Sequence, residues 1–442
     1  MILLGEGTVI TRDPANPIIT RGAVVMDKGA IVEVGAYDTL KSKYADATVV
    51  NAHGKLIMPG FINAHHHIYS ALARGLSIPG NNPTNFNEIL EGLWFFLDRH
   101  LKKEDVWASA VATYLACIEN GVTSIFDHHA SYGETEGSLS VIADVARQFG
   151  VRSCLCYEVS DRNGHEEMEK AVAENVRFGK EAAKDPAHLG AMFGLHASFT
   201  LSDDTLAYVR EQNIDKLGYH IHVAEGMADV EDSLAKYGVR TVERLYRQGI
   251  LGHRTIAGHC IHVDAEEIKR LQETKTTVVH NPESNMGNAV GAPDILALYK
   301  AGVRLGLGTD GYTSDMLESY KVANCLVKHR SGLPNQGWTE IPTMLFNNNR
   351  DIAGDFLNAR VGILKAGAAA DVIVMDYTAP TRLDATNING HLLFGANGMN
   401  VITTISDGIV RMQDRQLVGM DKEKLMEEVR RVADGLWKRL LA

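Results

Sequence analysis

The sequence predicts an α/β fold, a (β/α)8 TIM barrel with a small β-sandwich domain built from both chain ends. Between residues 58 and 360, short apolar runs alternate with helical stretches, which is the pattern of parallel strands joined by helices. About 300 residues in eight such repeats fit a closed barrel. β-rich segments lie on both sides of this region. We therefore expect the N-terminal part of the sandwich at 1–57, the barrel at 58–360, the C-terminal part of the sandwich at 361–420 and a C-terminal helix at 421–442.

The flanking segments are identified by their turns and by the spacing of apolar residues. AVVMDKGAIVEVG (23–35) predicts a hairpin with Lys28 and Gly29 in its turn. The same pattern of β-rich segments and turns occurs in ADVIVMDY (370–377) and in 400–419, where Asp407 and Gly408 mark a second tight turn. In the tail, apolar residues fall at helical spacing and predict an amphipathic helix that covers part of the core.

The eight apolar runs of the barrel share a second property. Each run carries an ionisable side chain at its C-terminal edge, and this edge of the strands forms the active-site face of such barrels. Core packing does not explain so many ionisable groups on one rim, so we expect them to form a single site. In chain order they are His67, His128, Glu158, His196, His222, His259, His280 and Asp310.

Composition excludes several classes of protein. The formal net charge is 44 − 55 = −11, which argues against nucleic acid as a partner because phosphate binding needs a basic patch. The five cysteines form no CxxC pair, which favours a reducing compartment, and we expect a cytoplasmic protein. The first 19 residues lack a basic region and a long apolar core, so they predict a strand rather than a signal peptide. No run approaches the roughly 18 apolar residues that a membrane span needs.

The most specific local motif is His65-x-His67. Residues two apart in a strand project from the same face, so both imidazoles can reach one ion. Further ligands should come from other strand ends, where His222, His259 and Asp310 are the candidates. Nitrogen and oxygen donors without cysteine suit a catalytic Zn²⁺ or Fe²⁺ rather than a structural zinc.

Glu225 follows the fifth run in the sequence HVAE. Three residues after His222, its carboxylate is placed to move protons between a metal-bound water and a substrate. A catalytic metal lowers the pKa of its water to about 7 and produces hydroxide at neutral pH. Asp310, in GLGTDG, could bind the metal and take a proton from the attacking water.

Five motifs together resemble a known family. PGFINAHHH, HVAE, GHC, HNPESN and GLGTDG match, in order and spacing, the metal-dependent amidohydrolase superfamily. Within it, the chain is most similar to the deaminase and chlorohydrolase branch, and HHASYGETEGSLS, YEVSDRNG and HNPESNMGNAVG resemble the SsnA group of aminohydrolases. The resemblance covers essentially the whole chain, and its motifs are far more specific for the superfamily than for a substrate.

The resemblance implies a role for each matching residue. The implied metal ligands are His65, His67, His222 and Asp310. The implied catalytic residues are Glu225 as proton shuttle, His259 as the hydrogen-bond partner of the attacking water, and Asp310. The implied substrate contacts are His196, His280 and Glu225. It also leaves open a homodimer or a higher homo-oligomer.

Two further features of the resemblance bear on the metal count and on the substrate. Relatives with two metals carry a bridging lysine on the fourth strand, and GAMFGLHASFT has none, so one divalent ion is expected, Zn²⁺ before Fe²⁺. Relatives often have a substrate-binding acid after the first strand, for which Glu88 and Glu91 are the candidates. Substrate contacts by Arg74, Trp94 and His128 remain open at this point.

The function that follows is that of a hydrolase acting on C–N bonds other than peptide bonds. We expect metal-bound hydroxide to attack an amino-substituted N-heterocycle of purine, pterin or pyrimidine type and to release ammonia. The alternative within enzymes is hydrolysis of a ring amide or of a carbon–halogen bond on a similar heterocycle. A non-catalytic binding subunit is disfavoured, because every expected ligand and shuttle position is filled.

Overall fold

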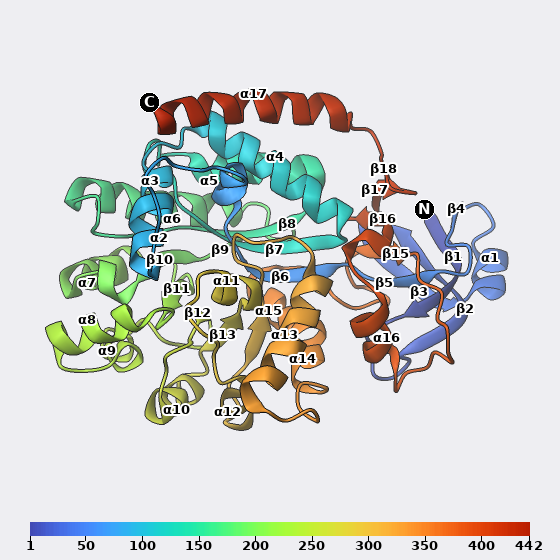
Figure 1. Ribbon diagram of the computed structural model, residues 1–442. Helices are drawn as coiled ribbons and strands as arrows, with labels where there is room; N and C mark the ends of the chain where they lie inside the picture. The colour runs from blue at the N-terminus through green and yellow to red at the C-terminus, as the bar shows by residue number, and fades with distance from the viewer.

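The computed structural model describes the whole chain, Met1–Ala442, as a barrel of parallel strands surrounded by helices with a β-domain at one side (Figure 1). The N-terminal strands and the late strands of the chain lie together in the β-domain, and the last helix lies across the outside of the barrel (Figure 1). The predicted fold class is confirmed.

The barrel strands form two parallel sheets that meet at two seams. Single parallel bridges, His66 with Asp310 and Val159 with Leu195, lie at these seams. The fourth predicted strand is divided at Met192, so that one half pairs with the third strand and the other with the fifth. In order, the strands are β6 (Phe61–His66), β7 (Val122–His129), β8 (Arg152–Tyr157) and β9 (Leu189–Ala191), followed by β10 (Phe193–Ala197), β11 (Tyr219–Val223), β12 (Ile256–His259), β13 (Thr277–His280) and β14 (Leu305–Leu307).

Burial on both faces explains why these strands read as continuous apolar runs. All eight residues of β7 and all six of β8 are buried, because side chains inside the barrel pack on each other and those outside pack under helices. The interior cluster includes Ile62, Phe126 and Met192. It also takes in Cys154 and Cys156, which are therefore packing residues.

The helices surround the barrel and one group interrupts the repeat after the first strand. That inserted group comprises η1 (Ile68–Ala73), α2 (Phe86–Ile89), η2 (Leu90–Trp94) and α3 (Phe95–Asp98). The remaining helices are α4 (Lys103–Glu119), α5 (Ser138–Phe149), α6 (His165–Ala182), η3 (Ser198–Thr200), α7 (Asp203–Gln212), α8 (Met227–Tyr237), α9 (Thr241–Arg247), α10 (Ala265–Glu273), α11 (Pro282–Gly287), α12 (Ile295–Lys300), α13 (Met316–Ser331), α14 (Glu340–Pro342), η4 (Thr343–Asn348) and α15 (Asn349–Phe356). None of the helices of the protein combines the length and the apolar composition that crossing a bilayer requires.

The β-domain is one connected nine-stranded sheet that draws strands from both chain ends, as predicted. At the predicted hairpin turn, Lys28 and Gly29 both have positive φ, +48° and +76°, as a two-residue I′ turn requires. The order is β18-β17-β16-β15-β5-β1-β2-β3, with β4 beside β1. The strands are β1 (Ile2–Ile10), β2 (Ile18–Asp27), β3 (Ala30–Ala36), β4 (Thr48–Asn51), β5 (Leu56–Pro59), β15 (Val372–Met375), β16 (Val401–Ser406), β17 (Ile409–Gln413) and β18 (Gln416–Leu417). Helices α1 (Tyr37–Lys43), α16 (Ile388–Gly395), η5 (Gly398–Asn400) and the predicted C-terminal helix α17 (Lys422–Leu441) complete the chain.

A buried ion pair joins the barrel to the β-domain. Arg152, the first residue of β8, donates from Nε to Asp371 Oδ2 at 2.8 Å, and both side chains are only 2% exposed. The same guanidinium donates to the carbonyl of Ala187 at 2.6 Å and to Asp407 at 3.1 Å. A charge buried in this way is tolerated only while its partner is present.

We expect the substitution R152M to destabilise the protein by about 3–5 kcal/mol, because Asp371 would keep its charge in a buried site without its partner. Thermal and urea unfolding would measure the loss. The matched control is R382A, which removes an arginine whose side chain is 88% exposed and pairs with Asp384 at the surface, and should cost less than about 1 kcal/mol. Equal effects of the two variants would contradict a structural role for the buried pair.

Candidate active site

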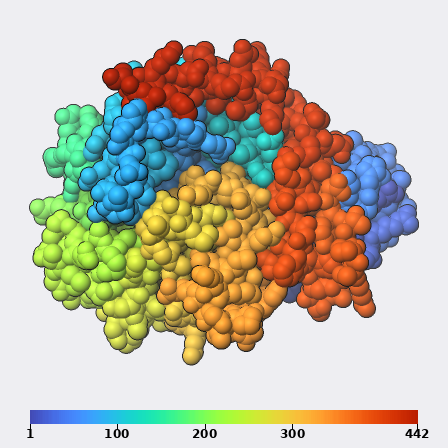
Figure 2. All heavy atoms as spheres, in the orientation of Figure 1, coloured from blue at the N-terminus to red at the C-terminus, as the bar shows by residue number.

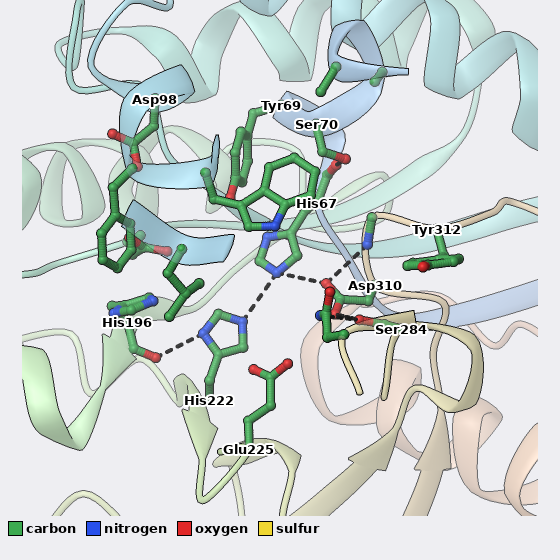
Figure 3. A pocket seen from close by; sticks show the side chains of 18 of the residues that line it. His67, Tyr69, Ser70, Asp98, His196, His222, Glu225, Ser284, Asp310 and Tyr312 are labelled. Atoms are coloured by element: carbon green, nitrogen blue, oxygen red, sulfur yellow. Dashed lines mark hydrogen bonds and ion pairs between the residues drawn. The ribbon is translucent and has the colours of Figure 1, made fainter. Parts of the chain in front are cut away.

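A cavity of about 420 Å³ opens at the C-terminal ends of the barrel strands. Its base is formed by the strand-end residues His67, His222 and Asp310, and its sides by η1 and by the α2–η2–α3 insertion (Figure 3). A cavity of this size and position is typical of an enzyme with a small-molecule substrate.

Four side chains at the base of the cavity converge on one point. His67 Nε2 lies 3.0 Å from Asp310 Oδ1 and 3.2 Å from His222 Nε2. His65 Nε2 lies 3.7 Å from the same Asp310 oxygen. Figure 3 shows the rings of His67 and His222 directed at one another and at the carboxylate. These are the four residues that the family resemblance implies as metal ligands.

Backbone carbonyls orient two of the imidazoles toward that point. His67 Nδ1–H donates to the carbonyl of His128 at 2.6 Å, and His222 Nδ1–H donates to the carbonyl of His196 at 2.9 Å. Since Nδ1 of each ring is bound to a carbonyl, the two Nε2 atoms are the ones that face each other, across 3.2 Å. His65 Nε2 is buried and has no hydrogen-bond partner at all. Lone pairs that face one another without a donor are the arrangement that a bound cation stabilises.

The negative charge of Asp310 also favours a cation bound at this point. Its carboxylate is held by Ser284 Oγ–H at 2.5 Å and by the backbone N–H of Gly311 at 3.0 Å. Although burial alone would lower the pKa of His67, the charge of Asp310 and its contact at 3.0 Å raise it to about 9. The cluster therefore favours a positive charge at its centre, and three imidazoles with a carboxylate fit a divalent metal ion.

Two further residues, His259 and Glu225, lie beside the four donors. His259 Nδ1–H donates to Asn285 Oδ1 at 2.7 Å, and its Nε2 lies 3.5 Å from Glu225 Oε2 and 3.7 Å from Asp310 Oδ2. Burial raises the pKa of Glu225 to about 7. At neutral pH this carboxyl group therefore exists in both protonation states, as proton transfer requires.

Residues at or just after the ends of three barrel strands have a strained backbone conformation. Ala224, His259 and Asp310 have φ values of +46°, +69° and +54°, in the left-handed region that non-glycine residues seldom adopt. Such conformations cost of order 1–3 kcal/mol each and persist where the surrounding contacts impose them. Of these three residues, Asp310 lines the cavity directly.

A second group of charges forms one side of the cavity. Asp98, the last residue of α3, and Glu158, which follows β8, both bind the guanidinium of Arg162. The Arg162 guanidinium also stacks on Phe95, 4.2 Å from the ring centre. Asp98 and Glu158 line the cavity, and Asp98 Oδ1 is buried without a hydrogen-bond partner. Burial raises the pKa of Asp98 to about 7, whereas Arg162 outweighs burial at Glu158 and lowers its pKa to about 2.

The predicted substrate contacts divide into those that reach the cavity and those that do not. His196, Glu225, Arg74 and Trp94 line it. His280 does not: it is buried, and its Nδ1 accepts a hydrogen bond from Asn285 at 3.4 Å, so it supports the residue that orients His259.

Among the remaining candidates, His128 lies beneath the cavity wall and bonds the carbonyl of Leu195 at 2.9 Å. Glu88 is exposed and bonds Thr84, and Glu91 is absent from the lining, so neither is the acid at the cavity. That position is taken by Asp98, which sequence reasoning missed. The available signal was its spacing: Asp98 follows Trp94 by four residues, which places both on one helical face.

A model of the amidohydrolase family matches residues 56–410 of the chain. The chain belongs to the amidohydrolase family. Two curated proteins are similar to this chain over nearly its whole length. A 5'-deoxyadenosine deaminase of Methanosarcina mazei is 32% identical over 99% of both chains, and a 5-methylthioadenosine/S-adenosylhomocysteine deaminase of Thermococcus sibiricus is 33% identical over 93% of this chain and 94% of its own.

The fold is also found in solved structures. One is described as an adenosine deaminase from Xanthomonas campestris with bound zinc; it has a TM-score of 0.86, 24% identity, and coverage of 99% of this chain and 98% of that chain. The predicted family, fold and aminohydrolase activity on an N-heterocycle are thus confirmed at the level of class.

We expect the purified protein to hold a divalent metal that a chelator removes, and we expect its removal to lower the melting temperature by several degrees, because buried lone pairs would then face one another without a cation. D310N should fail to retain the metal. Elemental analysis and thermal unfolding with and without chelator test both points. H165N, which alters a histidine 77% exposed on α6, is the control. A D310N variant with unchanged metal content would contradict the assignment.

Proposed function

We propose that this protein is a mononuclear, Zn²⁺-dependent deaminase of an adenosine-type nucleoside. The observation that carries the proposal is the placement of Glu225 and His259 beside four convergent metal donors, with a buried carboxylate pair on the side of the same cavity. The proposed metal ligands are His65, His67, His222 and Asp310. The absence of a lysine on β9 and β10 supports one ion rather than two.

A divalent cation bound at these ligands would act as a Lewis acid and bring the pKa of water near 7. His259, oriented by its Nδ1–H bond to Asn285, directs Nε2 to accept a hydrogen bond from the attacking water. Asp310 accepts the proton that this water loses on attack, and Glu225 donates its proton to the ring nitrogen next to the amino-bearing carbon. Asp310 then returns its proton to the amino group, which leaves as ammonia, and the hydroxyl proton passes to Glu225 as the product carbonyl forms.

The side of the cavity formed by Asp98 and Glu158 supports a nucleoside rather than a free base. A carboxylate with an unpaired oxygen can accept hydrogen bonds from adjacent sugar hydroxyls. Asp98 lines the cavity, and its buried Oδ1 has no hydrogen-bond partner in the protein. Arg162 holds the other Asp98 oxygen and so fixes the direction of the free one. The named substrates of the two curated relatives are adenosine derivatives, which agrees with this choice.

The proton-transfer role is tested by E225Q. This isosteric change should retain the metal and the fold but lower kcat by about 10²–10⁴-fold, because the amide cannot hold and release the proton. Ammonia release from 5'-deoxyadenosine, adenosine and a panel of amino-substituted purines, pterins and pyrimidines measures the activity. E231Q, an exposed glutamate on α8, is the matched control. Wild-type protein with bound zinc that releases no ammonia from any compound of the panel would overturn the proposed function.

The role of Asp98 is tested by comparing adenosine with 2',3'-dideoxyadenosine. Wild-type enzyme should prefer adenosine in kcat/KM, and D98N should reduce that preference by about tenfold, because an amide accepts fewer hydrogen bonds than a carboxylate. The comparison of two substrates cancels any general loss of stability. A preference that D98N leaves unchanged would show that the sugar hydroxyls bind elsewhere.

A further inference from the structure

Asp229 is a buried carboxylate outside the main cavity that joins two loops at the rim of the barrel. In Figure 2 the yellow-green part of the chain, which contains α8, forms a continuous surface at the lower left, and Asp229 in the first turn of α8 is only 3% exposed. Its Oδ2 accepts the backbone N–H of Ala224 at 2.8 Å, after β11, and its Oδ1 accepts that of Phe199 at 3.0 Å, after β10. Asp229 does not line the main cavity. Both of its oxygens are used to bind backbone.

Ala224 joins β11 to Glu225, and its backbone is strained. Its φ of +46° lies in the left-handed region, which an alanine keeps only where surrounding contacts impose it. Asp229 binds the N–H of this residue. Its carbonyl accepts two N–H groups from the loop after β12, those of Ile261 at 3.1 Å and His262 at 3.0 Å. Both peptide planes beside Ala224 are thus fixed, and the second of them contains the nitrogen of Glu225.

The other bond of Asp229 connects Ala224 to a loop that buried contacts already hold. Phe199 lies in η3, and the guanidinium of Arg244 from α9 donates to the backbone on both sides of it. These bonds reach the carbonyl of Ser198 at 2.6 Å and the carbonyl of Leu201 at 2.6 Å. The Arg244 side chain is 2% exposed. Asp229 therefore anchors the residue before Glu225 to a fixed part of the rim.

The position of Glu225 depends on this anchor. Without Asp229, the N–H of Ala224 would be buried without a partner, and its left-handed conformation would lose one of the contacts that impose it. A change of φ at Ala224 would move the Glu225 carboxylate, whose Oε2 lies 3.5 Å from His259 Nε2. Figure 3 shows this side chain directed from its loop toward the base of the cavity. A displacement of about 1 Å can lower a rate about 10²-fold.

We propose that Asp229 is a positioning residue for the reaction: through the backbone of Ala224 it holds Glu225 at the place from which Glu225 transfers protons. This rests on the proposed function, which assigns the proton transfer to Glu225. Asp229 is neither a proposed metal ligand nor part of the main cavity lining. Its loss should therefore lower the rate of proton transfer and leave the bound metal in place.

The first test is D229N, which keeps the size of the side chain but turns an NH2 group toward one of the two backbone N–H groups. The assay uses zinc-loaded enzyme and whichever of adenosine and 5'-deoxyadenosine the wild type deaminates faster. D229N should lower kcat by about 10–100-fold at unchanged zinc content. E225Q/D229N should lose less than about twofold relative to E225Q, because the two residues act through one proton transfer. An equal loss in both backgrounds would indicate a general structural effect.

A second comparison relieves the backbone strain directly. Glycine adopts a φ of about +46° without the cost that alanine bears, so A224G/D229N should have a kcat at least about threefold above that of D229N. The matched control is D105N on α4, which removes another buried carboxylate that accepts a backbone N–H, that of Lys102 at 2.8 Å. D105N should lower the melting temperature without lowering kcat.

A crystal structure of zinc-loaded D229N gives a readout that does not depend on activity. Glu225 Oε2 should lie farther from His259 Nε2 than the 3.5 Å of the wild type. If D229N does not fold, D229S, which keeps one acceptor, replaces it in every comparison. An unchanged kcat, an equal loss in both backgrounds, no recovery with A224G, or an unmoved Glu225 overturns the positioning role while the deaminase function stands. If the zinc-loaded wild type deaminates no compound, the proposed function fails and the role of Asp229 fails with it.

Discussion

Lone pairs that face one another at the base of the cavity are the constraint on which the rest of the active site depends. Three imidazole nitrogens and a carboxylate are held toward a common point, and His65 Nε2 among them has no hydrogen-bond partner in the protein. Parallel strands make this possible, because all their carboxyl ends open on the same rim. The carbonyls of His128 and His196 then fix which nitrogen of His67 and His222 carries a proton.

Burial raises the pKa of each carboxyl group in the cavity, but neighbouring charges decide the net shift. Around Glu225, removal from water raises the pKa to about 7 and makes the carboxyl group suitable for proton transfer. Around Glu158, the nearby guanidinium of Arg162 outweighs burial and keeps the carboxylate charged. Acidic residues of one cavity thus acquire different pKa values from their surroundings: Glu225 and Asp98 have pKa values raised to about 7, while Glu158 stays charged.

Much of this site could be predicted from residue order. His65 and His67 lie on one strand two residues apart, and the spacing alone places them on one face. Glu225 follows His222 closely in the chain, so their proximity is local as well. Asp98 could not be found by the same reasoning, because 31 residues (67–97) separate it from the first strand and the path of the chain through α2, η2 and α3 decides which acid reaches the cavity. His280 shows the converse: its strand end was identified, but the side chain turns toward Asn285 instead of the cavity.

The sequence by itself determined the alternation of strands and helices, the assembly of the β-domain from both chain ends and the identity of the donors at the strand ends. These are consequences of local periodicity and of the rule that parallel strands share one carboxyl edge. Only the tertiary structure decided which acids line the cavity. The contact of Trp437 with Leu72, next to the insertion after β6, joins segments 365 residues apart. Such long-range contacts depend on packing between elements, which leaves no periodic trace in the order of residues.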